Sequence, residues 1–147
     1  MGPCMKCGTW CEAVMYELSA CFERLSFPAD TCPVADVGDY LWIEEFCSCD
    51  CRAEARQSVL AKYDIPVRNP GSGPVETCAR CGATVDMAAW HLAVYQMDML
   101  IESEDVLRPT NATLLAVLCR RCCHMQTGAE VVPALNFSEA VADGKLP

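Results

Sequence analysis

The 147-residue sequence predicts a small α+β fold built from two tandem modules of similar design. Three observations support this prediction. The cysteines are laid out twice, because each half has a Cys-x-x-Cys-Gly turn followed by a second cysteine cluster. The gaps between the first and second clusters are nearly equal, at 39 and 37 residues. Each half has about 70 residues, a size at which an apolar core alone is marginal and a bound metal often supplies the missing stability.

The cysteine spacing predicts a metal site in each half. The first clusters begin at Cys4 and Cys78, and the second clusters begin at Cys47 and Cys119. Two such clusters brought together by folding form a tetrahedral thiolate site for a structural Zn²⁺ ion, although four thiolates also suit iron. We therefore expect two structural Zn²⁺ ions, with ligands drawn from ten candidates: Cys4, Cys7, Cys47, Cys49, Cys51, Cys78, Cys81, Cys119, Cys122 and Cys123.

A secreted disulfide framework is the alternative explanation for thirteen cysteines. The odd count, the paired Cys-x-x-Cys spacing and an N-terminal segment without a signal-peptide pattern all favour metal instead. No apolar run approaches the roughly 20 residues of a membrane span. We expect a cytoplasmic protein without a membrane partner, resident in the host-cell cytoplasm if a phage encodes it.

The first module is predicted over residues 1–63. Apolar side chains at three- and four-residue intervals indicate an inserted amphipathic helix over 14–25. A loop over 28–38 leads to a strand over 40–46, which runs into the second cluster. A second helix is expected over 52–63.

The second module is predicted over residues 78–127, after a Pro/Gly-rich linker at 64–77. An inserted amphipathic helix is expected over 88–100, followed by a loop at 102–109 and a strand at 114–118. Thr110 or Asn111 could instead cap a helix in that last segment. Residues 128–147 form a C-terminal tail, with a short helical stretch near 138–142.

The two modules align when the first is shifted by 74 positions. Cys4 then meets Cys78, and Gly8 meets Gly82. Glycine suits this position because a turn whose N–H groups face sulfur tolerates a positive φ best there. Internal duplication is the economical interpretation, and two independent zinc modules of similar length are the alternative.

Each module has a Cys-x-x-Cys-Gly turn, called a knuckle below, then a strand, and then a second cysteine pair that begins a helix. This order resembles a treble-clef zinc finger. In the first module, the run Phe46-Cys-Ser-Cys-Asp-Cys51 resembles the ending of FCS-type and MYM-type fingers. That resemblance implies Cys47 and Cys51 as ligands and leaves Cys49 spare. The longer middle segment departs from those short fingers, so their functions do not transfer.

The second module ends in Leu118-Cys-Arg-Arg-Cys-Cys-His124, which is similar to the ending of zinc-containing HNH endonucleases. Cys119 can pair with Cys122, by the commoner Cys-x-x-Cys spacing, or with Cys123, by the repeat alignment. An HNH nuclease would need His91 and His124, the two histidines of the chain, in catalytic roles. His91 lies in an apolar segment, and the residue before it is Trp90, whereas the family has Asp or His at that preceding position. We therefore expect no enzymatic activity.

The net charge of −9 favours a protein partner over nucleic acid, because acidic proteins are repelled by phosphate backbones. We expect a zinc-stabilised interaction or regulatory factor, such as a small acidic inhibitor or accessory subunit that occupies a basic, nucleic-acid-binding groove. The alternative is a non-catalytic nucleic-acid binder whose phosphate contacts come from a small basic set: Lys6, Arg52, Arg56, Arg120 and Arg121.

Overall fold

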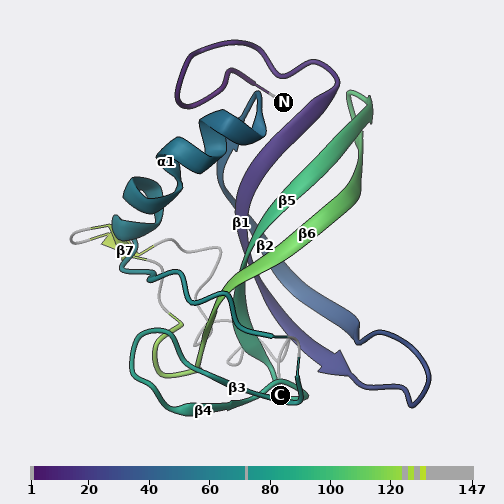
Figure 1. Cartoon of the computed structure of the whole chain (residues 1–147), viewed down its shortest axis with the longest axis vertical. Helices are drawn as coiled ribbons and strands as arrows, with labels where there is room; N and C mark the ends of the chain where they lie inside the picture. The colour runs from purple at the N-terminus through teal and green to yellow at the C-terminus, as the bar shows by residue number, and fades with distance from the viewer. Residues whose placement is uncertain (1, 72, 124–125, 128–129, 132–147) are drawn as a thin grey trace.

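The computed structural model describes residues 2–71, 73–123, 126–127 and 130–131. In chain order the elements are β1 (Val14–Ser26), β2 (Val34–Phe46), α1 (Cys49–Ala61), β3 (Val75–Thr77), β4 (Thr84–Asp86), β5 (His91–Ser103), β6 (Val106–Leu118), β7 (Gln126–Thr127) and β8 (Glu130–Val131). The predicted α+β class is confirmed: the described residues form mostly sheet, with one helix lying beside it (Figure 1). His124 and the helical stretch expected near 138–142 lie outside the described residues.

Four long strands form one antiparallel sheet in the order β2-β1-β5-β6. Each half of the chain contributes one hairpin, and the hairpins are joined through β1 and β5. Ala20 pairs with Val94 at this junction, and these two residues are separated by the same 74 positions as the repeat. The halves are therefore related by an approximate two-fold axis through this pair. The loop that precedes β1 lies at one end of the sheet, and β3 and β4 lie at the other (Figure 1).

The amphipathic helices expected over 14–25 and 88–100 are wrong, because these segments contain β1 and most of β5. Both are central strands. Leu18 and Phe22 are fully buried on one face of β1, and Ser19 and Glu23 are at most 1% exposed on the other. Residues 17–23 of β1 do alternate, with Ser19 and Glu23 on the opposite face from Leu18 and Phe22. The spacing of Leu18, Phe22 and Leu25 also satisfies a helical pattern, which the prediction followed.

The other predicted elements are confirmed with longer bounds. The strands expected at 40–46 and 114–118 are the final parts of β2 and β6, and the helix expected over 52–63 overlaps α1. Ser48 caps α1, since its Oγ accepts a hydrogen bond from the Cys51 N–H at 3.1 Å. The loop expected at 28–38 ends earlier, because β2 begins at Val34, and the loop expected at 102–109 is largely strand. The alternative helix starting at Thr110 or Asn111 is wrong because both lie in β6.

The segment after α1 packs against the sheet. Ile65 is 3% exposed, and the N–H groups of Arg68 and Asn69 both donate to the Leu115 carbonyl, at 2.9 and 3.0 Å. The main hydrophobic core contains buried residues from both halves, such as Phe22 and Leu118. The division into modules 1–63 and 78–127, a linker and a tail stays a prediction.

One face of β1 carries buried polar side chains. The Glu23 carboxylate lies 3.1 Å from His91 Nε2 and accepts hydrogen bonds from the Tyr95 hydroxyl and, at 3.7 Å, from the Cys21 thiol. His91 is 1% exposed, and its Nδ1 lies 2.8 Å from the Ala89 carbonyl. This network links the two central strands across the middle of the sheet.

Glu17 lies on the same face of β1 as Glu23, and its burial should make the free energy of unfolding depend on pH. Its side chain is fully buried, and burial raises its pKa from 4.5 to about 7, although the Tyr40 hydroxyl donates to its Oε1. A carboxyl whose pKa is raised on folding stabilises the protein below pH 4.5, and this contribution is lost as the pH rises through 7. Between pH 5.5 and 8 the wild type should lose about 2 kcal/mol relative to Glu17→Gln.

Denaturant unfolding at both pH values measures this difference, with Glu104→Gln as the exposed control. Equal pH profiles for wild type and Glu17→Gln would contradict the prediction.

Candidate metal centres

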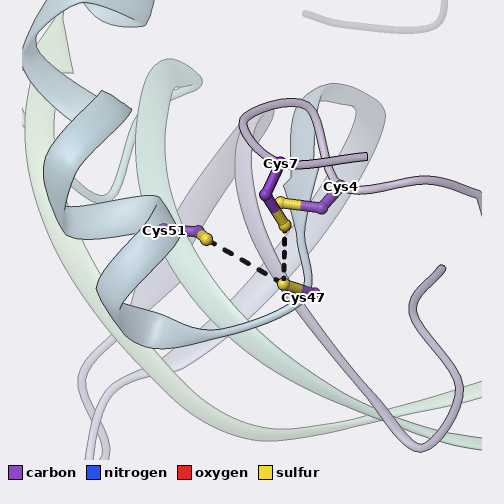
Figure 2. Close-up of side chains that lie close together, drawn as sticks. All are labelled: Cys4, Cys7, Cys47 and Cys51. Carbon is purple, nitrogen blue, oxygen red and sulfur yellow. Dashed lines mark hydrogen bonds between the residues drawn. The ribbon is translucent and has the colours of Figure 1, made fainter. Parts of the chain in front are cut away.

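The first group of sulfurs, called cluster 1, consists of Cys4, Cys7, Cys47 and Cys51. Their Sγ atoms all lie within 4.8 Å of one another. The first two come from the loop before β1, the third follows β2, and the fourth lies in the first turn of α1. Figure 2 shows the four side chains converging from these separate segments, with Sγ–Sγ distances of 3.5 Å for Cys7–Cys47 and 3.9 Å for Cys47–Cys51.

The second group, called cluster 2, consists of Cys78, Cys81, Cys119 and Cys122. Its sulfurs also lie within 4.8 Å of one another, and the Cys81 and Cys119 sulfurs are 3.7 Å apart. The first pair lies in the turn between β3 and β4, and the second pair follows β6. The two clusters thus use equivalent positions of the two halves.

The sulfur spacing matches tetrahedral coordination of one ion. Four sulfurs at the usual Zn–S distance of about 2.3 Å are about 3.8 Å from each other at the corners of a tetrahedron. Disulfide bonding requires about 2.0 Å. All thirteen cysteines are free thiols. The two Cys4 groups can therefore each hold a metal ion.

The two knuckle turns have the same backbone. The N–H of Gly8 donates to the Cys4 carbonyl at 2.9 Å, and the N–H of Gly82 donates to the Cys78 carbonyl at 2.9 Å. Gly8 has a φ of 78° and Gly82 a φ of 75°. The predicted need for glycine after each Cys-x-x-Cys is confirmed, because other residues are strained at such positive φ values.

The electrostatics of the sulfurs favour a cation between them. Burial raises the pKa of Cys78, but backbone N–H groups, first that of Cys119, outweigh it and lower the pKa to about 6. Hydrogen bonding with the Thr9 side chain and backbone lowers the pKa of Cys7 to about 6. The adjacent Cys7 sulfur raises the pKa of Cys47 to about 12. A metal ion binds the thiolate form of Cys47, and the Cys7 sulfur disfavours deprotonation to that form. A cation bound between the sulfurs would stabilise both thiolates and so lower the pKa of Cys47.

The structure leaves two of the ten candidate ligands outside both clusters. Cys49 is exposed in α1, whereas Cys51, in the same turn, belongs to cluster 1. Cys123 is fully buried, and its thiol donates to the Arg120 carbonyl at 2.9 Å. Cys122 occupies the fourth corner of cluster 2, so geometry favours the Cys-x-x-Cys spacing over the repeat alignment.

The basic residues expected near the second clusters are partly engaged within the fold. Arg52 has a side chain that is 7% exposed, forms an ion pair with Asp98 at 2.8 Å and lies over the Tyr16 ring. Arg56 donates to the Gln96 side chain at 2.9 Å. Both guanidinium groups therefore hold α1 against the sheet, Arg52 from a buried position and Arg56 from a half-buried one.

Sequence reasoning missed Arg80, which lies inside the second knuckle. Its guanidinium donates to the Asp64 carbonyl at 2.8 Å and to the carbonyls of Tyr63 and Cys122. It thereby ties the end of the α1 segment to both cysteine pairs of cluster 2. The repeat indicated this position, because Lys6 is its equivalent in the first half and pairs with Glu54, in the second turn of α1, at 2.9 Å.

Replacement of Arg80 by lysine tests this connection. An ammonium group cannot reproduce the planar fork that bonds three carbonyls, so Arg80→Lys should cost about 2 kcal/mol of unfolding free energy. The equivalent Lys6→Arg substitution, at an exposed ion pair, should leave the unfolding free energy essentially unchanged. Chemical denaturation measures both values, and equal effects would contradict the proposed bridging role.

No protein-family model matches the chain, and no match was found among the curated proteins or the solved structures. Within the described residues, no helix has the length and apolar character needed to cross a membrane.

Proposed function

We propose that this chain is a zinc-stabilised protein-interaction or regulatory factor without enzymatic activity, built on two treble-clef-type modules. The observation that supports it most strongly is the pair of four-cysteine clusters with the sulfur spacing of tetrahedral coordination. Four protein ligands fill a tetrahedral site, which is the arrangement of structural zinc; catalytic zinc sites keep one position for water or substrate. The two Zn²⁺ ions would therefore stabilise the fold and take no part in a reaction.

The location of the clusters supports a structural role. Cys4 and Cys78 are 3% and 2% exposed and belong to the same hydrophobic core as the central strands. Each cluster joins the turn before one hairpin to the residues after that hairpin. An ion in each cluster would therefore close a loop of about 40 residues and stabilise the fold outright.

The charge supports a basic protein partner. The net charge is −9, and a Zn²⁺ ion bound by four thiolates adds further negative charge. We propose that the partner offers a basic surface, such as a nucleic-acid-binding groove that this chain would occupy as an inhibitor or accessory subunit. The internal ion pair of Arg52 and the internal hydrogen bond of Arg56 favour this role over direct nucleic-acid binding.

Elemental analysis of the purified, reduced protein tests the proposal. We expect two zinc ions per chain, whereas iron or a metal-free folded protein would overturn the zinc assignment. DNA affinity at two salt concentrations tests the alternative, because a nucleic-acid binder must weaken steeply with salt. We expect no salt-sensitive DNA binding, and its detection would favour the nucleic-acid role.

A further inference from the structure

Within the part of the chain that the structure describes, β2 is an edge strand whose one sheet neighbour is β1. Its outer edge is unpaired there over most of its length. Among the described residues, the Met5 N–H, which donates to the Glu45 carbonyl at 3.0 Å, is the one backbone group from outside the sheet that bonds to β2. The stretch 34–43 therefore presents N–H and C=O groups to an additional strand in two regular segments, 34–37 and 40–42, separated and bounded by register irregularities at 38–39 and 43.

Apolar side chains follow this edge on one face. Val37, Tyr40 and Trp42 pair with alternating residues of β1, so they share a face of the sheet. They are 49%, 39% and 43% exposed, respectively. The Tyr40 hydroxyl is held by Glu17, which fixes the ring at the edge. An added strand would find both hydrogen-bonding groups and an apolar strip that its side chains could cover.

The opposite edge, at β6, lacks these properties. The Leu115 and Val117 carbonyls accept hydrogen bonds from the N–H groups of Arg68, Asn69 and Ala79. The remaining part of β6 contains Pro109, which has no N–H group, and Arg108. Proline and a basic residue are devices that block strand addition at an edge. β2 contains neither a proline nor a lysine or arginine.

Charge decides what kind of strand fits β2. The strand carries four carboxylates, at Asp36, Asp39, Glu44 and Glu45; Asp36 pairs with Arg24, and Glu45 also has an interaction within the protein. A second copy of this chain, added antiparallel about Tyr40, would place Asp36 opposite Glu44 twice. Like charges directly opposite each other destabilise strand pairing, and two chains of −9 also repel. A segment with lysine or arginine at alternate positions is complementary instead.

We propose that the free edge of β2 accepts an extended, Lys/Arg-bearing segment of a partner protein as a fifth strand of the sheet. The inference rests on the proposed interaction function and locates its contact surface. Backbone hydrogen bonds along 34–43 would provide affinity. The carboxylates and the Val37–Tyr40–Trp42 strip would select a segment that alternates basic and apolar residues.

The probe for the test is a fluorescein-labelled decapeptide of alternating lysine and valine, with an alternating glutamate–valine peptide as the control. Anisotropy should show binding of the lysine peptide alone. Val37→Lys should weaken this binding at least tenfold, and Val106→Lys should change it less than twofold. The two variants change the net charge equally, because each replaces a valine by a lysine. The two positions are also matched in exposure, at 49% for Val37 and 47% for Val106, and lie on opposite edge strands. Trp42→Ala should also weaken binding, without a change of charge.

Hydrogen exchange supplies the second measurement: the bound peptide should protect amides of residues 34–43. Equal weakening by the two lysine variants would overturn the proposal, because it would show attraction by net charge alone. Absence of binding, protection confined to another surface, or self-association of the wild type that Val37→Lys abolishes would each overturn it as well.

Zinc content measured on the same sample separates the two proposals. A two-zinc protein that does not bind the peptide overturns the β2 site alone, whereas a metal-free protein overturns the proposed zinc scaffold.

Discussion

Removal of both metal ions is expected to unfold the protein. Structural zinc contributes about 10–16 kcal/mol of apparent binding free energy in zinc-finger peptides, whereas whole domains are stable by about 5–15 kcal/mol. Here Cys4 and Cys78, one from each cluster, belong to the core that also holds Phe22 and Leu118, so loss of the ions should remove more stability than the sheet possesses. The freed thiolates, at 3.5 to 3.9 Å, would in addition repel one another or take up protons.

Circular dichroism during titration with a zinc chelator, in the presence of reductant, measures this effect. We expect cooperative loss of the β-sheet signal, complete before a chelator-treated sample reaches 37 °C, and recovery when zinc is added back. A matched titration with the chelator already saturated by zinc controls for non-specific effects. A chain shown by elemental analysis to be metal-free, yet unchanged in spectrum and thermal midpoint, would contradict the expectation.

The second large effect concerns neighbouring cysteines in cluster 2. Cys122→Ser should reduce the zinc content from two ions to one and lower stability by several kcal/mol, because a hydroxyl is a poor replacement for a thiolate. Cys123→Ser should keep both ions and cost about 1 kcal/mol, since Cys123 is a buried thiol that bonds the Arg120 carbonyl. The two variants differ in sequence position by one residue and in predicted metal content by one ion.

Cluster 1 offers the same comparison. Cys51→Ser should lose one ion, and Cys49→Ser, at an exposed position in the same helical turn, should lose none. Metal analysis after gel filtration, together with thermal melts, distinguishes the four proteins. Retention of two ions by Cys122→Ser, with loss by Cys123→Ser, would show that the repeat alignment, and not the convergence of the four sulfurs, identifies the ligand.

The sequence was most informative where the chemistry is local. A Cys-x-x-Cys turn followed by Gly8 or Gly82 needs few neighbours to form, and both turns have the expected positive φ. The convergence of each turn with a distant cluster followed from the same spacing in both halves. The choice between Cys51 and Cys49, or between Cys122 and Cys123, depends on the direction in which one side chain leaves a short turn, and spacing alone does not determine it.

The periodicity of the central strand β1 fits a strand and a helix at once. β1 presents Leu18 and Phe22 to one side and Glu17, Ser19 and Glu23 to the other, and all five are buried. The Glu23 carboxylate is tolerated there because His91 and Tyr95 come from β5, a strand about 70 positions away. Such compensation is long-range, so the local sequence gave no reason to expect a buried glutamate. The alternation over 17–23 indicates a strand, and the helix prediction followed the competing three- and four-residue spacing of the apolar side chains.

The Ala20–Val94 pairing has a consequence for the order of events during synthesis. The inner edge of β1 finds its partner only when β5 has been made, so the sheet cannot close while the ribosome is still translating the first half. Contacts between residues this far apart along the chain slow folding and leave apolar strands open for longer. A prematurely released N-terminal fragment would therefore expose that edge, and its most similar available partner would be the β1 of another such fragment.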